Sequence, residues 1–456
     1  MAKELLVRAY RVGFGDCIFL QIPDKDKLFT VLIDCGTSAA ANTVLKPVVK
    51  HLVENLPKDE DGNPHLDLMV VTHPHSDHIK GFDPSWFSGV TIDRIWMSAF
   101  MDLAHPKAQK ALASEQSAFL AAKSLLERQG LQFTPDVRIL LERSLSLCNS
   151  SALSALRENL PAEYPRLYVA RDVAEHLSDA ERSTHHLSIE NGVTSFSGFS
   201  DEDISLRILA PEWDIDGTYL GKFSAEDSPF TDPLIFGTSG YDKDIDVEGL
   251  LTKEPVDLSP ESLTIPEPEN ISSRDFRMLR NRLLYSALAF SQEDDALKND
   301  VSVVFLLEWH GKRLLFTGDA EWRGNGIEAG RRNSSWDVMM GRSEVKDLLL
   351  QPLDFFKVAH HGSFNGSPFD DETGWQLIEK MVSPDRTHVV ISTETEVHNN
   401  VPFISLMKKL GELAKNKQTY SEGEIELIDV PQPRRTDRES DSSVSGVDYV
   451  EEKFSL

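Results

Sequence analysis

The sequence predicts an α/β fold with two insertions, and three observations support this prediction. Short apolar segments typical of β-strands recur in both halves of the 456-residue chain. Amphipathic helical patterns separate several of these segments, which is the alternation typical of α/β domains. Histidine and aspartate residues follow directly after several strand-like segments. Because the chain is longer than one compact domain needs, we expect one core fold with insertions, or two domains.

The first half of the core fold is expected within residues 1–100. Val44, Val48 and Leu52 share one face of a predicted helix at 43–55. Strands are predicted at 5–10, 17–22, 28–33, 66–72 and 92–96. A glycine pair at 13 and 15 separates the first two strands. A phosphate-binding loop is one interpretation of this pair, but no Lys-Ser/Thr follows it and no helix begins there, so a tight hairpin is the better one.

Two insertions are expected to interrupt the core. Residues 101–185 are predicted as a helical insertion, because the stretch after Pro106 is rich in Ala, Leu, Lys and Glu. Residues 186–211 return to strand patterns, at 194–199 and 204–209. Residues 212–298 are predicted as an acidic, loop-rich insertion that a helix at 276–290 closes.

The second half of the core fold is expected within residues 299–430. It is predicted to hold strands at 301–309, 313–316, 354–358, 388–392 and 424–430, and a helix at 402–413. Residues 431–456 are expected to form a mobile tail, because much of this stretch is polar and poor in apolar residues.

Composition limits the function classes. The net charge of −27 opposes non-specific attraction to nucleic acids and anionic membranes. A metal cleft carries its own local positive charge, so this argument does not exclude a nucleic-acid substrate. We find neither a long apolar run nor a signal-peptide core, so we expect a cytoplasmic protein with no membrane partner. Cys17, Cys35 and Cys148 are too few for a disulfide framework and are expected to be reduced thiols.

The stretch with the clearest chemistry is His-Pro-His-Ser-Asp-His at 73–78, directly after the apolar run 66–72. Three imidazoles and a carboxylate at one strand end are a ligand set suited to zinc, manganese or iron. A tight turn lets His73 and His75 point into one cavity while Asp77 and His78 reach a second position, so two metals are predicted. The alternative, a chance surface cluster, is disfavoured because so many ligand-type side chains at a strand end need a common partner.

Further candidates follow other predicted strands. Asp319 is a candidate to bridge two cations. Asp34 is either an outer partner of the metals or a plain turn residue. His360 and His361 are adjacent at a strand end, where both side chains have access to the same cleft. His398 lies in a polar loop and is either a solvated histidine or a catalytic one.

The spacing His-x-His-x-Asp-His resembles the metal-binding signature of the metallo-β-lactamase superfamily. Together with segments 12–16, 32–36, 299–302, 316–319 and 357–363, it is similar to the ComEC-type branch, whose hydrolase domain accompanies DNA-uptake channels and also occurs alone. This resemblance implies an αββα sandwich with metal ligands on loops at one edge of paired sheets. It also implies two divalent ions, zinc or manganese, and a phosphodiester substrate such as DNA or RNA.

The resemblance also implies roles for individual residues. His360 or His361 would complete the second metal site, and the other would face the substrate. Many superfamily members have a further histidine in the interval that here holds His185 and His186, but these lie in the insertion. The implied ligands are His73 and His75 for one metal, Asp77 and His78 for the other, and Asp319 between them, with Asp34, Asn299 and Ser302 in the surrounding shell.

Three functions remain open from the sequence. The first is a metal-dependent phosphodiesterase or nuclease that uses a metal-bridged hydroxide, in bacterial defence or DNA processing, with the insertions recognising substrate or a protein partner. In this function Asp77 would orient the hydroxide, while His361 or His398 would contact the phosphate or protonate the leaving group. The second is a hydrolase of a small ester, lactone or thioester. The third is a metal-binding regulatory module without turnover.

Overall fold

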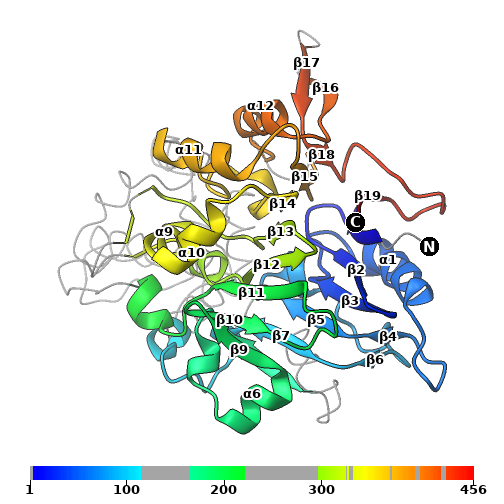
Figure 1. The fold of residues 1–456 in the computed structure, drawn as a ribbon. Coiled ribbons are helices and arrows are strands. Elements are labelled where there is room, and N and C mark those ends of the chain that lie inside the picture. The colour runs from blue at the N-terminus through cyan, green and yellow to red at the C-terminus, as the bar shows by residue number, and fades with distance from the viewer. Residues whose placement is uncertain are drawn as a thin grey trace, which may run out of the picture.

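Two large mixed β-sheets form the centre of the computed structural model (Figure 1). The structure describes residues 4–113, 165–220, 296–324, 326–327, 332–369, 372–395, 401–422 and 428–456. The first sheet has the strand order β19-β1-β2-β3-β5-β7-β8 and the second has the order β18-β15-β14-β13-β12-β11-β10-β9. Each sheet combines an antiparallel part with a parallel part.

The strands of the first sheet are β1 (Glu4–Tyr10), β2 (Ile18–Asp24), β3 (Lys27–Ile33), β5 (Leu68–Val71), β7 (Ile95–Ser98), β8 (Arg166–Val169) and β19 (Tyr449–Ser455). Those of the second sheet are β9 (Leu187–Glu190), β10 (Val193–Phe196), β11 (Ile204–Ala210), β12 (Val304–Trp309), β13 (Lys312–Phe316), β14 (Phe355–Lys357), β15 (His388–Ile391) and β18 (Arg434–Arg435). Two small pairs lie outside these sheets: β4 (His65–Leu66) with β6 (Thr91–Ile92), and β16 (Gln418–Glu422) with β17 (Ile428–Gln432).

The main core lies between the two sheets. Successive side chains of a strand point to opposite faces, so every second residue of β1, β2 and β3 directs its side chain toward the second sheet. Val7, Leu20 and Val31 pack in one buried cluster with Phe305 and Leu314 of the second sheet. Burial of this apolar surface holds the two sheets together.

Helices cover the outer faces. Helix α1 (Ala41–Asn55) buries Leu45, Val48 and Leu52 against the first sheet. A separate cluster on the second sheet includes Trp336 and Leu406. Its helices are α9 (Ser335–Gly341), α10 (Ser343–Leu349), α11 (Glu372–Met381) and α12 (Ile404–Leu413). The resulting order of helix, sheet, sheet and helix is consistent with the αββα sandwich implied by the sequence.

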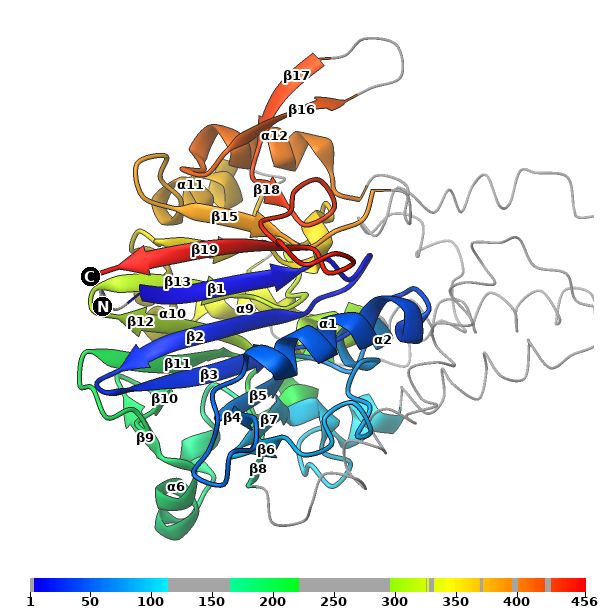
Figure 2. The ribbon, with the colours of Figure 1, turned by 90° about the vertical axis from the view of Figure 1, so that its right-hand side faces the viewer.

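The chain terminus differs from expectation. We expected residues 431–456 to be mobile, but residues 449–455 form β19, which pairs antiparallel with β1 along its length (Figure 2). Val450 and Phe454 are buried in the core between the sheets. The alternating pattern of this strand is short and follows a polar stretch, so the sequence did not predict it. Pairing with β1 supplies backbone hydrogen bonds that a local sequence pattern does not reveal.

The insertions also differ in their boundaries. Strand β8 lies within the predicted helical insertion 101–185 and extends the first sheet in parallel with β7. The expected strand at 92–96 is divided between β6 and β7. Of the expected edge strand at 424–430, residues 424–427 lie outside the described residues, and the rest belong to β17, which pairs with β16 and joins neither large sheet. Residues 114–164 and 221–295, with the helix expected at 276–290, lie outside the described residues.

Candidate metal centre

The predicted ligands come together at the carboxyl ends of parallel strands from both sheets. The segment 73–78 follows β5 and enters the short helix α2 (Ser76–Ile79), and Asp34 follows the neighbouring strand β3. In the second sheet, Asp319 follows β13, while His360 and His361 follow the parallel strand β14. Because the two sheets face each other, their loops meet at one edge of the sandwich.

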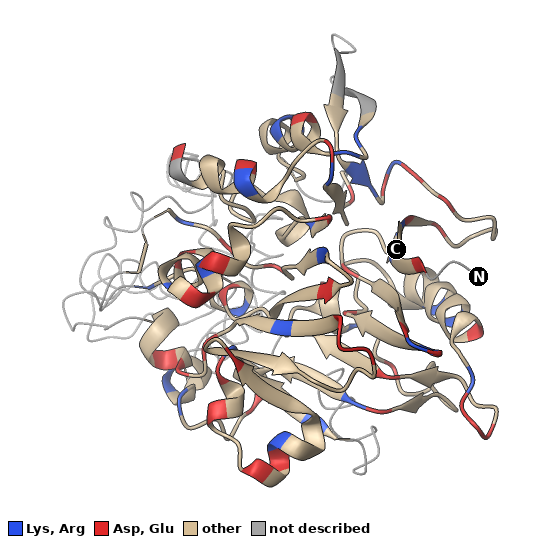
Figure 3. Ribbon diagram, in the orientation of Figure 1, with Lys and Arg blue, Asp and Glu red and all other residues tan. Residues whose placement is uncertain are grey.

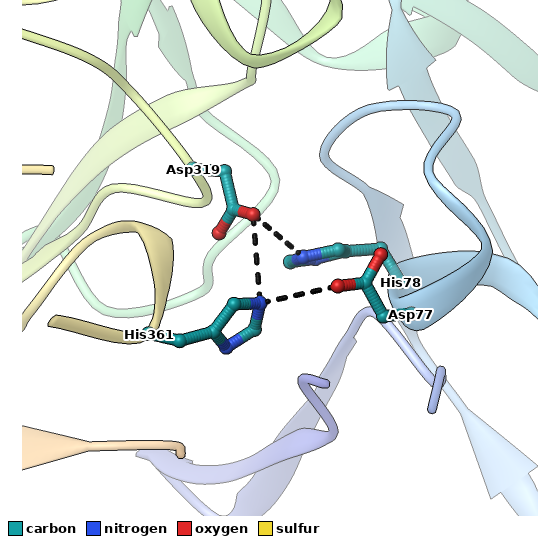
Figure 4. Close-up of side chains that lie close together, drawn as sticks. All are labelled: Asp77, His78, Asp319 and His361. Atoms are coloured by element: carbon teal, nitrogen blue, oxygen red, sulfur yellow. Dashed lines mark hydrogen bonds and ion pairs between the residues drawn. The ribbon is translucent and has the colours of Figure 1, made fainter. Parts of the chain in front are cut away.

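Asp77, His78, Asp319 and His361 form the largest group of potential metal donors among the described residues (Figure 4). Nε2 of His78 lies 3.1 Å from Oδ2 of Asp319. Nε2 of His361 lies 3.5 Å from the same oxygen and 3.4 Å from Oδ2 of Asp77. All four residues are buried, so water is largely excluded from the space between their donor atoms.

His73, His75 and Asp319 form the second donor group. Nε2 of His73 lies 2.9 Å from Nδ1 of His75 and 3.8 Å from Oδ2 of Asp319. Asp319 therefore belongs to both groups. A carboxylate shared by two buried donor groups is the arrangement expected of a bridging ligand.

Hydrogen bonds outside the donor groups fix the orientation of two imidazoles. Asp34 lies 2.8 Å from Nδ1 of His78, and this carboxylate must accept the bond, which leaves Nε2 of His78 directed at Asp319. In the same way, Nδ1 of His361 donates to the backbone oxygen of Ser392 at 3.0 Å. Asp34 is thus a partner of a donor histidine in the structure and not a plain turn residue.

Two further contacts hold the loops that carry the donors. Thr72 donates from its backbone nitrogen and its hydroxyl to Asp34, at 2.8 and 2.6 Å. The backbone nitrogen of Asp319 donates to Oγ of Ser302 at 3.2 Å. Ser302 therefore lies in the shell around the donors, as the resemblance implies.

The charges of the donors depend on each other. Burial disfavours the imidazolium of His78, but the Asp319 and Asp34 carboxylates raise its pKa well above the ordinary value. Although burial opposes the charged carboxylate of Asp319, His78 and His361 hold its pKa well below the ordinary value. Burial, aided by His78 and His75, lowers the pKa of His73 well below the ordinary value. His73 is thus held neutral, the form in which an imidazole binds a metal.

The adjacent histidines at the end of β14 take separate positions. Both have positive φ angles, 47° for His360 and 54° for His361, which side chains other than glycine seldom adopt. This turn directs His361 into the donor group. His360 instead lies beside Asn299 and Glu321, with its Nε2 3.5 Å from Nδ2 of Asn299 and its Nδ1 3.8 Å from Oε1 of Glu321.

Glycines let the loops of the first sheet approach helix α2. A Cβ atom placed on Gly36 would lie 2.0 Å from the carbonyl carbon of Asp77 and 2.1 Å from the nitrogen of His78. Gly15 has a φ of 155°, and its Cβ would lie 2.6 Å from the backbone oxygen of Asp77. Gly15 and Gly36 thus let their loops pack against helix α2, which carries Asp77 and His78. The interpretation of the first glycine pair as part of a hairpin did not include this role.

Several residues are absent from the donor groups. His185 ends helix α6 (Asp179–His185) and His186 follows it; among the described residues neither belongs to a group of potential metal ligands. His398 lies outside the described residues. Glu321 was missed at the sequence level, although it is buried and accepts a hydrogen bond from Asn299 at 2.8 Å. Its position two residues after Asp319, on the loop that carries that donor, could have indicated that Glu321 lies near the site.

A family comparison matches the part of the chain that carries the first-sheet donors. Residues 10–85 match the model of the Metallo-beta-lactamase superfamily. The matched segment holds strands β2, β3 and β5, helix α1, Asp34 and the donors His73, His75, Asp77 and His78. No curated protein matches the chain. Among the described residues, no helix is long and apolar enough to cross a membrane.

The residues present fit divalent metal ions. Imidazole and carboxylate donors suit zinc and manganese, and the donor atoms of each group lie within 4.8 Å of one another. Oδ1 of Asp319 is buried and makes no hydrogen bond to any described residue. Such atoms are costly to bury without a partner. Residues 10–85 thus resemble a domain of the Metallo-beta-lactamase superfamily, and the buried donor groups at the edge of the sandwich are suited to hold metal ions.

Proposed function

We propose that this chain is a phosphodiesterase that cleaves DNA or RNA with two divalent metal ions. The observation that carries the proposal is the sharing of Asp319 by two buried donor groups, one with His73 and His75 and the other with Asp77, His78 and His361. When bound, a pair of divalent ions makes water nucleophilic near neutral pH and offsets negative charge on a phosphoryl group.

The protein residues have distinct parts in this proposal. His73 and His75 would hold one ion, while Asp77, His78 and His361 would hold the other, and Asp319 belongs to both groups. The Asp77 carboxylate would also accept a hydrogen bond from the attacking water and so orient it toward phosphorus. The low exposure of these side chains keeps bulk water from competing for the same hydrogen bonds.

His360 is the candidate to meet the substrate. Its side chain is 19% exposed, whereas that of His361 is fully buried. Asn299 and Glu321 limit the positions that its ring can take. We propose that His360 contacts a phosphoryl oxygen. His398 is a separate candidate, which would protonate the leaving group.

The phosphodiester substrate is supported by the resemblance of six sequence segments to the ComEC-type branch and by the suitability of paired ions for phosphoryl groups. The test is incubation of the purified protein with single- and double-stranded DNA, RNA and a bis-aryl phosphodiester, with manganese or zinc added. The double variant His75→Ala/Asp77→Ala is expected to be inactive. The variant His176→Ala changes an exposed histidine outside the donor groups and is expected to keep full activity.

Cleavage by the wild type and by His176→Ala, but not by the double variant, would support the proposal and reveal the preferred polymer. Absence of cleavage of every phosphodiester by a protein loaded with metal would contradict it.

A hydrolase of a small ester, lactone or thioester is the second candidate. The net charge of −27 favours it, because an acidic protein repels polynucleotides. Figure 3 shows acidic residues on the exposed helix α6 and on the loop between α1 and β4. Salt separates the two functions: cleavage that depends on phosphate contacts along a strand weakens steeply with salt, whereas turnover of a small neutral ester is nearly insensitive to it.

A further inference from the structure

A buried ion pair joins the two sheets directly beneath the donor groups. Nζ of Lys357, the last residue of β14, lies 2.9 Å from Oδ2 of Asp16 in the loop between β1 and β2. The two side chains are 1% and 2% exposed. Removing both charges from water is costly, and replacing such a pair by apolar residues is often neutral or stabilising. Stability alone therefore does not explain the pair.

On the side of the first sheet, Asp16 is bonded to the loops that carry two donors. Its backbone nitrogen donates to the backbone oxygen of Asp77 at 3.0 Å, and its backbone oxygen accepts from the nitrogen of Gly36 at 2.9 Å. Gly36 follows Asp34 closely and packs against the backbone of His78. A shift of Asp16 would therefore move the donor helix α2.

On the side of the second sheet, Lys357 is bonded to the loops that carry the other donors. Its backbone oxygen accepts from Oγ1 of Thr317 at 2.8 Å, two residues before Asp319. Nζ also donates to the backbone oxygen of Val358 at 3.0 Å, at the start of the turn that leads to His361. Oδ1 of Asp16 lies 3.8 Å from Nδ1 of His361.

We infer that the Lys357–Asp16 ion pair is a positioning device for the metal site made by Asp77, His78, Asp319 and His361. The pair fixes the distance between helix α2 on one sheet and the His361 turn on the other. Because the two segments lie on different sheets, neither segment sets this distance by itself. In the other donor group only Asp319 comes from the second sheet, whereas His73 and His75 both follow β5, so this group depends less on the spacing between the sheets. Breaking the pair should therefore affect the two metal sites unequally.

The test is the zinc content of the double variant Asp16→Asn/Lys357→Met, which removes both charges together so that neither is left buried alone. The wild type is expected to bind two zinc ions per chain. The double variant is expected to bind one, or to bind the second at least tenfold more weakly, while its metal-free melting temperature stays close to that of the wild type. A structural role alone would change the melting temperature and leave zinc binding intact.

The matched control is Arg8→Met/Glu451→Gln, which removes an ion pair between β1 and β19 with a 2.6 Å contact and no donor residue nearby in sequence. It is expected to bind two zinc ions. Asp16 also lies in a buried group of potential metal ligands with Asp34 and His78, so the single variant Lys357→Met, which keeps the Asp16 carboxylate, separates loss of the ion pair from loss of a ligand. It is expected to weaken binding of the second zinc ion, and it also serves if the double variant fails to fold.

The inference rests on the metal centre of the proposed function but not on its substrate. Two tightly bound zinc ions in the wild type and equally tight binding in the folded charge-removal variants would overturn the inference alone. A wild type that binds no zinc or manganese would overturn the proposed metal centre, and the positioning role with it.

Discussion

The Nε2 atom of His78 lies 3.1 Å from the Oδ2 atom of Asp319, although 241 positions separate the two residues in the chain. His78 belongs to the first sheet and Asp319 to the second. Their contact shows that the donor groups are assembled only when both sheets are packed face to face. Metal binding and correct packing of the two sheets should therefore be coupled.

The shared carboxylate predicts the first result. Asp319→Asn keeps the shape of the side chain but removes the charge that both donor groups use. We expect loss of tightly bound metal from both sites and a fall in kcat/KM of at least about a hundredfold, since even changes to outer partners of metal ligands cost about 10–100-fold. Elemental analysis and steady-state kinetics measure both. Asp179→Asn, which changes an exposed residue of helix α6 outside every group of potential metal ligands, should leave both values unchanged.

The bond from His78 to Asp34 predicts a smaller effect. Asp34→Asn should weaken metal binding about 10–100-fold, because the amide no longer fixes the imidazole through a charged hydrogen bond. Asp67→Asn is a matched control: Asp67 accepts from the backbone nitrogen and hydroxyl of Thr30, both at 2.8 Å, just as Asp34 accepts from Thr72. Equal zinc affinities for the two variants would show that Asp34 acts only on the fold.

The raised pKa of His78 predicts how pH affects the metal-free protein. The unfolded chain loses the His78 proton near the ordinary pKa of 6.5. In the folded state burial lowers the pKa of His78, but the Asp319 and Asp34 carboxylates outweigh burial, so the pKa is raised. The contribution of His78 to stability is therefore fully present below pH 6.5 and is lost as the pH rises through the raised pKa.

Unfolding of the wild type and of His78→Gln in chelator, from about pH 5 to about pH 9, measures this contribution. The advantage of the wild type should shrink as pH rises. Zinc should reverse the trend, because metal binding needs the neutral imidazole. A stability difference that grows with pH without metal would contradict this assignment of the proton.

The close contact between Gly36 and helix α2 predicts that a larger residue at position 36 disturbs the metal site. Gly36→Ala places a methyl group 2.0 Å from the backbone of Asp77, so helix α2 must move. We expect a loss of at least about 1–3 kcal/mol in the free energy of unfolding, together with weaker metal binding. Gly89→Ala, at an open site with a φ of 79°, should cost about 1 kcal/mol and leave metal binding intact. Chemical denaturation and zinc titration compare the two.

Donors that lie close together in sequence were predictable. The segment 73–78 carries four of them after one strand, and the predicted strand ends placed Asp34 and Asp319 near the same edge. Those predictions need only strand periodicity and the chemistry of the side chains.

Contacts between the two sheets were not predictable in the same way. The choice between His360 and His361 depends on a left-handed turn, and the pairing of Lys357 with Asp16 depends on how the sheets face each other. Strand β19 depends on pairing with β1 at the opposite end of the chain. None of these relationships leaves a periodic signal in one segment.

The central claim, that one carboxylate joins two metal sites, is tested most directly by crystals grown with zinc or manganese and measured at the absorption edge of the metal. Two anomalous peaks about 3.5–4 Å apart are expected. One should lie beside His73 and His75, the other beside Asp77, His78 and His361, with Asp319 in contact with both. A single peak, or peaks that do not touch Asp319, would contradict the account.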